Sequence, residues 1–244
     1  MVKLPSIEEM LKSGMHFGHR TSKWHPKMAP FIFGQRAGVH IIDLQKTNVK
    51  LAEALAFITK IVAENKVILM VGTKDQVKNR LKAQALEVDM PYVNNRWIGG
   101  TLTNFAIVKH LIKTYVDLKE KKENGKLTKY TKKEQVDFDK QIKKLEIRVG
   151  GLTNMKKLPD AMFIWDIKKE KNALTEANKK GVPVVAVCDT NVNPDGVKYV
   201  IPSNDDAVKA IKLVLQLIGE AIKEGRVQMS QKKAETVKLE SVKK

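Results

Sequence analysis

The sequence predicts an α/β fold: a flavodoxin-like, doubly wound parallel sheet in a three-layer α/β/α arrangement, with an inserted antiparallel coiled-coil helical hairpin. Three observations favour this class. Short apolar runs alternate with segments whose apolar residues recur at helical spacing, which indicates strands joined by helices that cover both faces of a sheet. The apolar runs are continuous, as in strands buried on both faces. The alternation is interrupted once, by two charged helical segments around a polar break.

The chain is expected to begin with a short helix over residues 7–12. Ser6 and Glu9 form a capping box in front of its apolar residues, and Gly14 ends it. A histidine-rich stretch, residues 16–28, follows this helix. The N-terminal region is therefore expected to be ordered before the first strand of the main sheet begins.

The next segments introduce the α/β pattern. Residues 31–43, FIFGQRAGVHIID, predict two short strands, because β-branched and aromatic residues flank a glycine-containing turn. Apolar side chains between residues 47 and 65 recur at helical spacing and predict a helix. VILMVG, residues 67–72, is then expected to be the first buried strand, and the helix KDQVKNRLKAQALEV follows it.

The same alternation returns in the last third of the chain. Strands are expected at residues 160–166, 182–189 and 198–202, with a helix closed by Gly181 between the first two. Cap residues 203–206 open a last helix, whose apolar side chains keep a spacing of three to four. The sheet should therefore contain four or five core strands.

Two segments in the middle of the chain show the heptad-like spacing of a helical hairpin with a narrow seam. The apolar seam positions recur at intervals of three and four: Val108, Leu111, Tyr115 and Leu118, then Gln135, Phe138, Ile142, Leu145 and Val149. Between Lys109 and Arg148, thirteen basic minus seven acidic residues give a net charge of +6. A hairpin covered by charge in this way is expected to project from the domain.

These elements predict three units. Residues 1–103 and 150–226 form a discontinuous α/β domain, and residues 104–149 form the hairpin insertion. The segment from Arg226 onward carries six basic and two acidic residues. Residues 227–244 are therefore expected to be a basic tail that is disordered in isolation.

The charge of the chain indicates a polyanionic partner. Lys and Arg number 45, and Asp and Glu number 27, which gives a formal net charge of +18 at pH 7. Nucleic acid is the first candidate, because neutralising phosphates releases counterions. An anionic membrane surface is the second, but no apolar run reaches the roughly 18 residues of a membrane span. Acids also stand where a signal peptide would carry bases.

The sequence gives poor support to an enzyme. The glycine fingerprint of dinucleotide-binding folds, the P-loop and the nucleophile elbow are all absent from it. Cys188 is the one cysteine, so an internal disulfide and a CxxC metal site are excluded. Its apolar neighbours predict a buried small side chain. This cysteine usage fits a reducing cytoplasm, and no small-molecule substrate is expected.

The histidine-rich stretch, HFGHRTSKWHPKM, mixes rings with basic side chains. Arg20, Lys23 and Lys27, with Arg36 beyond the stretch, are candidate partners for RNA phosphate, and Trp24 offers a flat face for stacking. Such a mixture suits irregular RNA, where bases and backbone are both exposed. The alternative is a packed segment whose aromatic residues cover the sheet. Both interpretations can hold for different side chains.

A second candidate RNA contact lies in the segment RWIGGTLTNF. Gly99, Gly100 and Thr101 open a helix, and the first backbone N–H groups of a helix are free to bind an anion. Arg96 stands just before them. A phosphate of RNA fits this place. The alternative is an ordinary helix N-cap after a flexible turn.

The histidines also raise the hypothesis of a divalent metal ion. Asp189 is expected to end one parallel strand and Asp205 to open the helix after the next, so both should lie at the carboxyl edge of the sheet. If the N-terminal segment crosses that edge, His16 or His19 joins the two carboxylates. Such mixed ligands suit zinc better than magnesium. In the rival account no cofactor is bound, the carboxylates cap local N–H groups, and the histidines pack or meet RNA.

Three long motifs occur in order along residues 1–226: GMHFGHRTSKWHPKMAPFIFGQRAGVHIIDLQKT, NNRWIGGTLTNF and PDAMFIWDIKKEKNALTEANKKGVPVVAVCDTNVNPDGVKYVIPSNDDA. Together they resemble the bacterial small-subunit ribosomal protein S2 family. The resemblance implies a structural, non-catalytic protein that binds small-subunit ribosomal RNA between the head and the body of the subunit. It also implies contacts with neighbouring small-subunit proteins and with ribosomal protein S1, which helps to recruit messenger RNA.

Two classes of function therefore remain. A cytoplasmic, ribosome-bound component that binds ribosomal RNA is favoured. The alternative is an RNA-directed enzyme, such as a methyltransferase or a nuclease, on a doubly wound fold. A cofactor-binding glycine loop or paired carboxylates at one strand edge would support the enzyme, and the sequence shows neither convincingly.

Overall fold

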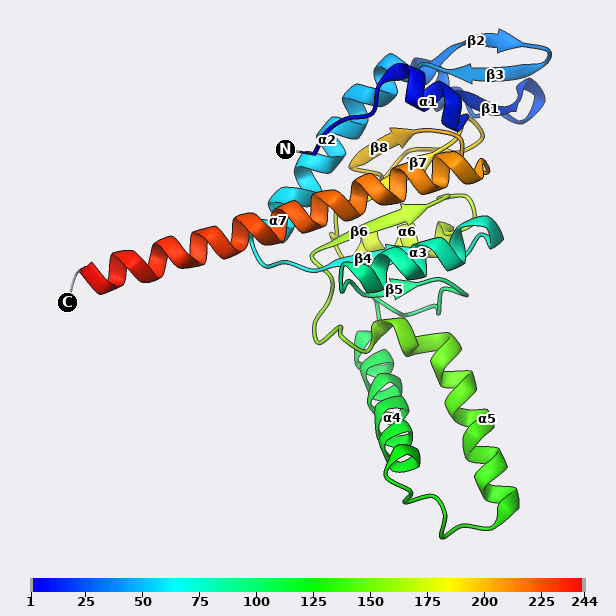
Figure 1. The fold of residues 1–244 in the computed structure, drawn as a ribbon. Helices are drawn as coiled ribbons and strands as arrows, with labels where there is room; N and C mark the ends of the chain where they lie inside the picture. The colour runs from blue at the N-terminus through cyan, green and yellow to red at the C-terminus, as the bar shows by residue number, and fades with distance from the viewer. Residues whose placement is uncertain (1, 243–244) are drawn as a thin grey trace.

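Five parallel strands form the main sheet of the computed structural model, which describes residues 2–242 and the side chains as far as Lys232. The strands are β4 (Ile68–Val71), β5 (Tyr92–Val93), β6 (Ala161–Trp165), β7 (Val184–Cys188) and β8 (Tyr199–Pro202). Their order across the sheet is β5-β4-β6-β7-β8. The first of these strands in the chain thus lies between the second and the third, which is the flavodoxin-like order. The predicted fold class is confirmed (Figure 1).

The apolar runs of the sequence correspond to strands that are buried on both faces. Every residue of β4, β6 and β7 is buried. Successive side chains of a strand point to opposite faces of its sheet, so each strand contributes to two cores. In β6, Phe163 and Trp165 belong to one core, and Met162 and Ile164 belong to the other.

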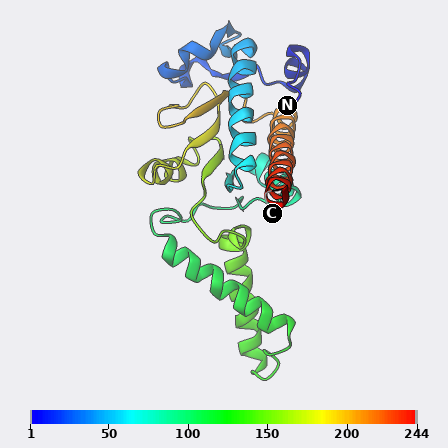
Figure 2. The same ribbon diagram turned by 90° about the vertical axis from the view of Figure 1, so that its left-hand side faces the viewer.

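Helices cover both cores. The first core is covered by α2 (Leu44–Ala63), α3 (Asp75–Glu87) and α7 (Val208–Val242). Figure 2, in which α2 is cyan and α7 is orange to red, shows these two helices on the same side of the sheet. The second core is covered by α6 (Lys171–Lys179) and by the root of the helical insertion.

The N-terminal region forms a small sheet of its own. Helix α1 (Ile7–Ser13) has the predicted capping box and ends at Gly14. Strands β2 (Ile32–Arg36) and β3 (Val39–Ile42) are the predicted pair, and a third strand, β1 (Phe17–Arg20), joins them in the antiparallel order β1-β3-β2. Sequence analysis missed β1, because FGHR has no run of strand-forming residues. Pairing with β3 makes it a strand.

The insertion consists of helices α4 (Phe105–Glu123) and α5 (Lys132–Val149), which pack against each other and extend away from the sheet (Figure 1). The coiled-coil character of the pair remains a prediction. Its buried side chains are Val108, Ile112 and Tyr115 in α4, and Ile142, Leu145 and Val149 in α5. Leu111, a predicted seam residue, is only partly buried. The next residue, Ile112, is buried instead. These side chains share one core with the sheet.

Helix α7 continues past the predicted end of the α/β domain. It runs without a break to Val242, whereas sequence analysis predicts a disordered tail from residue 227. The segment from residue 227 to 242 contains no glycine or proline and is rich in strong helix formers, so nothing local ends the helix at Arg226. In the described part of the chain, no helix is long and apolar enough to cross a membrane.

The outer half of the α4–α5 pair should loosen without loss of the sheet. Leu118 lies in the last turns of α4 and is only partly buried, whereas Val149 lies at the root and is fully buried. Burial of such a side chain contributes about 1.5–3 kcal/mol. We expect Leu118→Asp to raise amide hydrogen exchange in α4 and α5 alone, and Val149→Asp to raise it in β4 and β6 as well. Equal loss of protection in both regions of the Leu118 variant would show that the outer half is not independent.

Candidate functional site

The N-terminal segment crosses the carboxyl edge of the parallel sheet. The backbone N–H of His25 donates to the carbonyl oxygen of Thr190 (2.8 Å), and the N–H of His19 donates to Thr190 Oγ1 (2.9 Å). A Cβ atom on Gly18 would stand only 2.6 Å from Thr190 Cγ2, so this approach requires glycine. Residues 15–28, called the strap from here on, thus cover the edge at which doubly wound folds bind their ligands.

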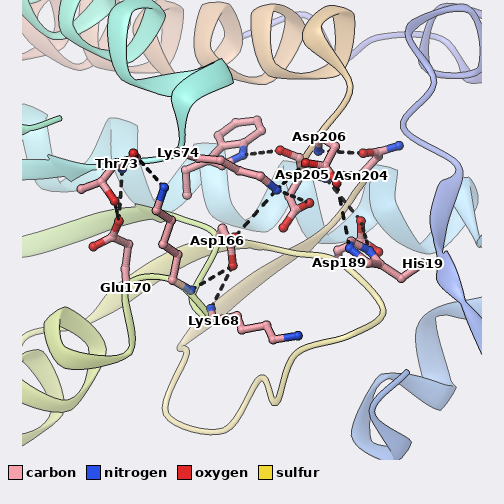
Figure 3. Close-up of polar contacts among 12 residues, drawn as sticks. His19, Thr73, Lys74, Asp166, Lys168, Glu170, Asp189, Asn204, Asp205 and Asp206 are labelled. Carbon is pink, nitrogen blue, oxygen red and sulfur yellow. Dashed lines mark hydrogen bonds and ion pairs between the residues drawn. The ribbon is translucent and has the colours of Figure 1, made fainter. Parts of the chain in front are cut away.

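Four aspartates gather beside the strap at the ends of three strands (Figure 3). Asp166 follows β6, Asp189 follows β7, and Asp205 and Asp206 follow β8. Asp189 and Asp205 are almost completely buried, each with an exposed fraction of 1%. Burying like charges together is costly unless cations offset them.

Lys74 supplies one of these cations. Its Nζ lies 2.9 Å from Asp205 Oδ1 and 2.6 Å from Asp206 Oδ1, with Asp166 Oδ2 farther away at 3.8 Å. Burial by itself lowers the pKa of Lys74, but the hydrogen bonds to Asp206 and Asp205 outweigh it and raise the pKa above its ordinary value. Lys74 therefore stays protonated in the site.

His19 supplies the second positive group. Its Nδ1 lies 3.1 Å from Asp189 Oδ2, and its Nε2 lies 3.9 Å from Asp206 Oδ2. The hydrogen bond to Asp189 is the main reason why the pKa of His19 is raised, and burial opposes it. Of the two histidines in the metal hypothesis, His19 is the one that reaches the carboxylates.

His16 does not reach them, which corrects that half of the hypothesis. Its ring packs against Phe17, with the centroids 4.0 Å apart, and burial lowers its pKa. His16 lies in the turn before β1, and the register of β1 shifts between Phe17 and Arg20, so simple alternation along a strand does not relate the two side chains. One sequence motif therefore contains two histidines in different surroundings.

The excess of negative charge in the cluster affects the pKa of Asp205. Its pKa is raised to about 6, first by burial and then by the nearby charge of Asp189, while Lys74 opposes the rise. The cluster holds four carboxyl groups against one lysine and one histidine. Nδ1 or Nε2 of His19 and one oxygen each from Asp205 and Asp206 lie within 4.8 Å of one another. Chemically, the arrangement is suited to holding a cation.

Several residues in and around this cluster are not predicted from the sequence. Lys74, Asp166 and Asp206 are not among the sequence candidates, and neither is Glu170, whose carboxylate accepts the backbone N–H of Thr73 (3.1 Å). A usable signal was present, because Lys74 and Asp166 each come soon after a buried strand. The rule that identified Asp189 would have identified them.

The segment around Gly100, which is the second candidate RNA contact, already binds an anionic group of the protein itself. The carboxylate of Glu176, in α6, accepts the backbone N–H groups of Gly100 (2.8 Å), Leu102 (3.0 Å) and Thr103 (3.1 Å). It also accepts Trp97 Nε1 (3.0 Å). Burial by itself raises the pKa of Glu176, but these hydrogen bonds outweigh it and hold the pKa below its ordinary value.

The free N–H groups predicted for this segment are therefore not free. Thr101 is also satisfied: it is 1% exposed, its N–H donates to the carbonyl oxygen of Ile98 (3.1 Å), and its Oγ1 donates to the same oxygen (2.6 Å). A phosphate has no donor left to bind at Gly100 and Thr101. Gly99 and Arg96 remain exposed. The sequence could not reveal this, because Glu176 lies more than 70 residues further along the chain.

The basic side chains of the strap and its sheet face solvent. Arg20, Lys23 and Arg36 are exposed and have no ion pair among the described residues. Lys27 is exposed as well, but it is paired with Asp195. Exposed aromatic rings stand among them: Trp24, whose ring centroid lies 5.2 Å from that of His40, and Phe33, which is 80% exposed and was not a sequence candidate.

One comparison with known proteins bears on this arrangement. The model of a protein family described as ribosomal protein S2 matches residues 10–225 of the chain. The match includes the strap, the aspartate cluster, Glu176 and the α4–α5 pair.

Loss of the Glu176 charge should detach the segment that precedes α4. Glu176→Gln keeps the shape of the side chain but leaves its N–H donors facing an amide, so we expect a loss of about 2–3 kcal/mol in the free energy of unfolding at pH 7. Because the pKa is lowered in the folded state, this contribution is present above the ordinary value of 4.5 and is lost as the pH falls through the folded value. Denaturant unfolding of both proteins between pH 7 and 3 measures it.

The matched control is Glu120→Gln, at an exposed glutamate of α4. It should change the free energy of unfolding by less than about 0.5 kcal/mol. If Glu176→Gln were equally mild, or if the difference from the unmodified protein did not narrow as the pH falls below 4.5, the carboxylate would not hold the segment as described.

Proposed function

The chain belongs to the ribosomal protein S2 family and is therefore a structural protein of the small ribosomal subunit, and from that premise we propose how it is used there. We propose that, in a bacterial subunit, it binds small-subunit ribosomal RNA at the junction of head and body. We propose also that it helps to dock ribosomal protein S1. The family match over residues 10–225 is the observation that carries the proposal.

The surface of the N-terminal sheet supports the assignment of RNA contacts. Arg20, Lys23 and Arg36 are exposed and unpaired among the described residues, and exposed rings of Trp24 and Phe33 lie in the same region. Phosphate contacts position a protein on RNA, and aromatic faces stack on bases that have left the helix. Lys27 contributes less, because Asp195 already neutralises it.

The carboxyl edge of the sheet supports a non-catalytic role over an RNA-directed enzyme. An enzyme of this fold needs that edge for its cofactor or substrate. Here the strap covers it, Lys74 and His19 pair with its carboxylates, and the carbonyl oxygen and side-chain Oγ1 of Thr190 accept hydrogen bonds from the strap. The S1 contact rests on the resemblance to the family, and the test below includes it.

A second proposal concerns a cofactor. We propose that His19, Asp205 and Asp206 hold one divalent metal ion, with zinc favoured by the mixed nitrogen and oxygen ligands. Asp189, which the sequence suggested as a ligand, lies behind His19 and bonds its Nδ1. A carboxylate in that position orients a metal-binding histidine through its other nitrogen. The excess of carboxyl groups over cations in the cluster supports the same proposal.

RNA binding should depend steeply on salt and on the strap. Neutralised phosphates release counterions, so affinity for RNA is expected to fall linearly on a logarithmic scale as salt rises. Arg20→Glu with Lys23→Glu should lower both the affinity and the salt slope, and should reduce incorporation into small subunits. Filter binding and co-sedimentation measure these effects. Subunits reconstituted without the chain should also retain less S1.

The charge-matched control is Lys132→Glu with Lys133→Glu, at exposed positions in the first turn of α5, at the end of the α4–α5 pair that lies away from the sheet and the strap (Figure 1). It changes net charge by the same amount and should have a smaller effect. Wild-type occupancy of the strap variant, or equal losses in both variants, would contradict the assignment.

The metal proposal predicts one equivalent of a divalent ion per chain. Elemental analysis of protein purified without chelator, then dialysed against zinc, should find it. His19→Asn should lose the metal, because it removes the only nitrogen ligand of the set, while His16→Asn should keep it. Metal-free protein after dialysis, or equal metal loss in both variants, would end the proposal.

A further inference from the structure

A cleft lies where the α4–α5 pair meets the edge of the sheet. One hollow, with a cavity volume of about 390 Å³, is formed by α3, by β5 and the residues after it, by the second half of α4 (Tyr115 and Lys119), and by the root of α5. A second hollow of about 460 Å³ adjoins it, beside the segment from Arg96 to Gly99. Ile147 and Arg148 line both hollows. The two together are called the root cleft below.

The root cleft is positively charged. Lys82, Lys119, Arg148 and Arg96 line it, against one acid, Glu146. Among the described residues, none of these four cations has an ion pair. Each cation is therefore free to neutralise the charge of a ligand.

Neighbouring lysines on the same helices behave differently. Lys78 lies one turn before Lys82 in α3 and is paired with Asp75 (2.7 Å). Lys122 lies one turn after Lys119 in α4 and is paired with Asp139 (2.8 Å). On these two helices, Lys78 and Lys122 are thus neutralised within the protein, whereas Lys82 and Lys119, which line the root cleft, are unpaired among the described residues.

The root cleft also offers groups that suit a base. Tyr115 is 5% exposed and lines the first hollow, and its hydroxyl has no hydrogen-bond partner among the described residues. Tyr92 lines the same hollow. Leu86 and Ile147 stand at its rim and are both 60% exposed, which is unusual for large apolar side chains. Cations beside rings and apolar surface are typical of sites for unstacked nucleotides.

The walls of the root cleft are held in place before any ligand arrives. Glu176 fixes the segment from Trp97 to Thr103 through five hydrogen bonds. Gly151 packs so closely on β5 that a Cβ atom there would stand 2.3 Å from the carbonyl oxygen of Tyr92. A site built before binding loses less conformational freedom when the ligand binds.

We propose that the root cleft binds one unstacked nucleotide of single-stranded or bulged RNA, with its base in the first hollow and its flanking phosphates on the four cations. This inference rests on the proposed function of RNA binding and adds a second contact to it. It also replaces the anchor that the sequence suggested at Gly100 and Thr101, whose N–H groups are occupied. Arg96 is retained from that anchor.

The test uses the full chain and two labelled RNA probes of equal length: an unstructured single strand and a perfectly paired hairpin without a bulge. Lys119→Gln with Arg148→Gln removes two exposed cations of the root cleft. We expect this variant to bind the single strand about tenfold more weakly in anisotropy titrations, with a salt slope smaller by about 1.4, the value for two phosphates of a single strand. Its affinity for the paired hairpin should fall less.

Two further variants distinguish a general loss of positive charge from damage to the proposed nucleotide site. Lys78→Gln with Lys122→Gln removes the same charge from the paired neighbours and should change single-strand affinity by less than about twofold. Tyr115→Phe deletes only the hydroxyl and should weaken single-strand binding by about threefold to tenfold, without change for the paired hairpin. A single strand carrying 4-thiouridine should cross-link to the peptide that contains Tyr92 or Tyr115.

The outcomes distinguish this inference from the proposed function. If the unmodified chain binds neither probe and does not enter small subunits, the proposed function fails. If it binds RNA and the strap variant weakens that binding, the function stands. The inference is then overturned when the Lys119 and Arg148 variant binds like the unmodified chain, when both probes lose affinity equally, or when the cross-link forms only on the strap.

Discussion

Four carboxyl groups meet at the carboxyl edge of the sheet, and the need to neutralise them governs the N-terminal part of the structure. Asp189 and Asp205 are almost completely buried, so their charges cannot be left to solvent. Lys74 reaches the cluster from the end of β4, next in the sheet. His19 can reach it only if the strap crosses the edge, which in turn requires the pairing of β1 with β3 and the absence of a side chain at Gly18.

At the root of the α4–α5 pair the requirement is reversed: there, N–H donors of the backbone need a negatively charged acceptor. Buried backbone N–H groups in the turn before α4 need an acceptor. Glu176 provides it from α6, across more than 70 residues of chain. The two places at which a doubly wound fold ordinarily receives an ionic ligand are thus both lined by the protein's own counter-charges. This arrangement suits a protein of the small ribosomal subunit, whose partners bind its surface.

The surface charge follows from this internal pairing. Interior carboxylates are matched with cations, as Asp205 is with Lys74, or with N–H donors, as Glu176 is, and several exposed lysines are matched with carboxylates a turn away, such as Lys78 with Asp75. The net charge of +18 therefore lies on basic side chains that have no acidic partner among the residues that the structure describes. Two places with such side chains are the strap, with Arg20 and Lys23, and the root cleft, with Arg148. In both, unpaired cations stand beside exposed or unpartnered rings, so the local composition is the same although the elements are different.

Local pattern by itself determined the fold class and most of the elements, but not β1, which is a strand only through its pairing with β3. The capping box of α1, the continuous apolar runs of β4, β6 and β7, and the helical spacing of α2 and α7 depend on neighbours in sequence, so they could be predicted. The carboxyl-edge rule likewise placed Asp189 and Asp205 together, because parallel strands end on one side. Which side chains meet there was decided by the tertiary structure alone. His19 rather than His16, Asp206 and Lys74 beside Asp205, and Glu176 in place of a phosphate all depend on contacts between distant segments, and charge is neutralised by whatever lies nearest in space, which residue spacing does not encode.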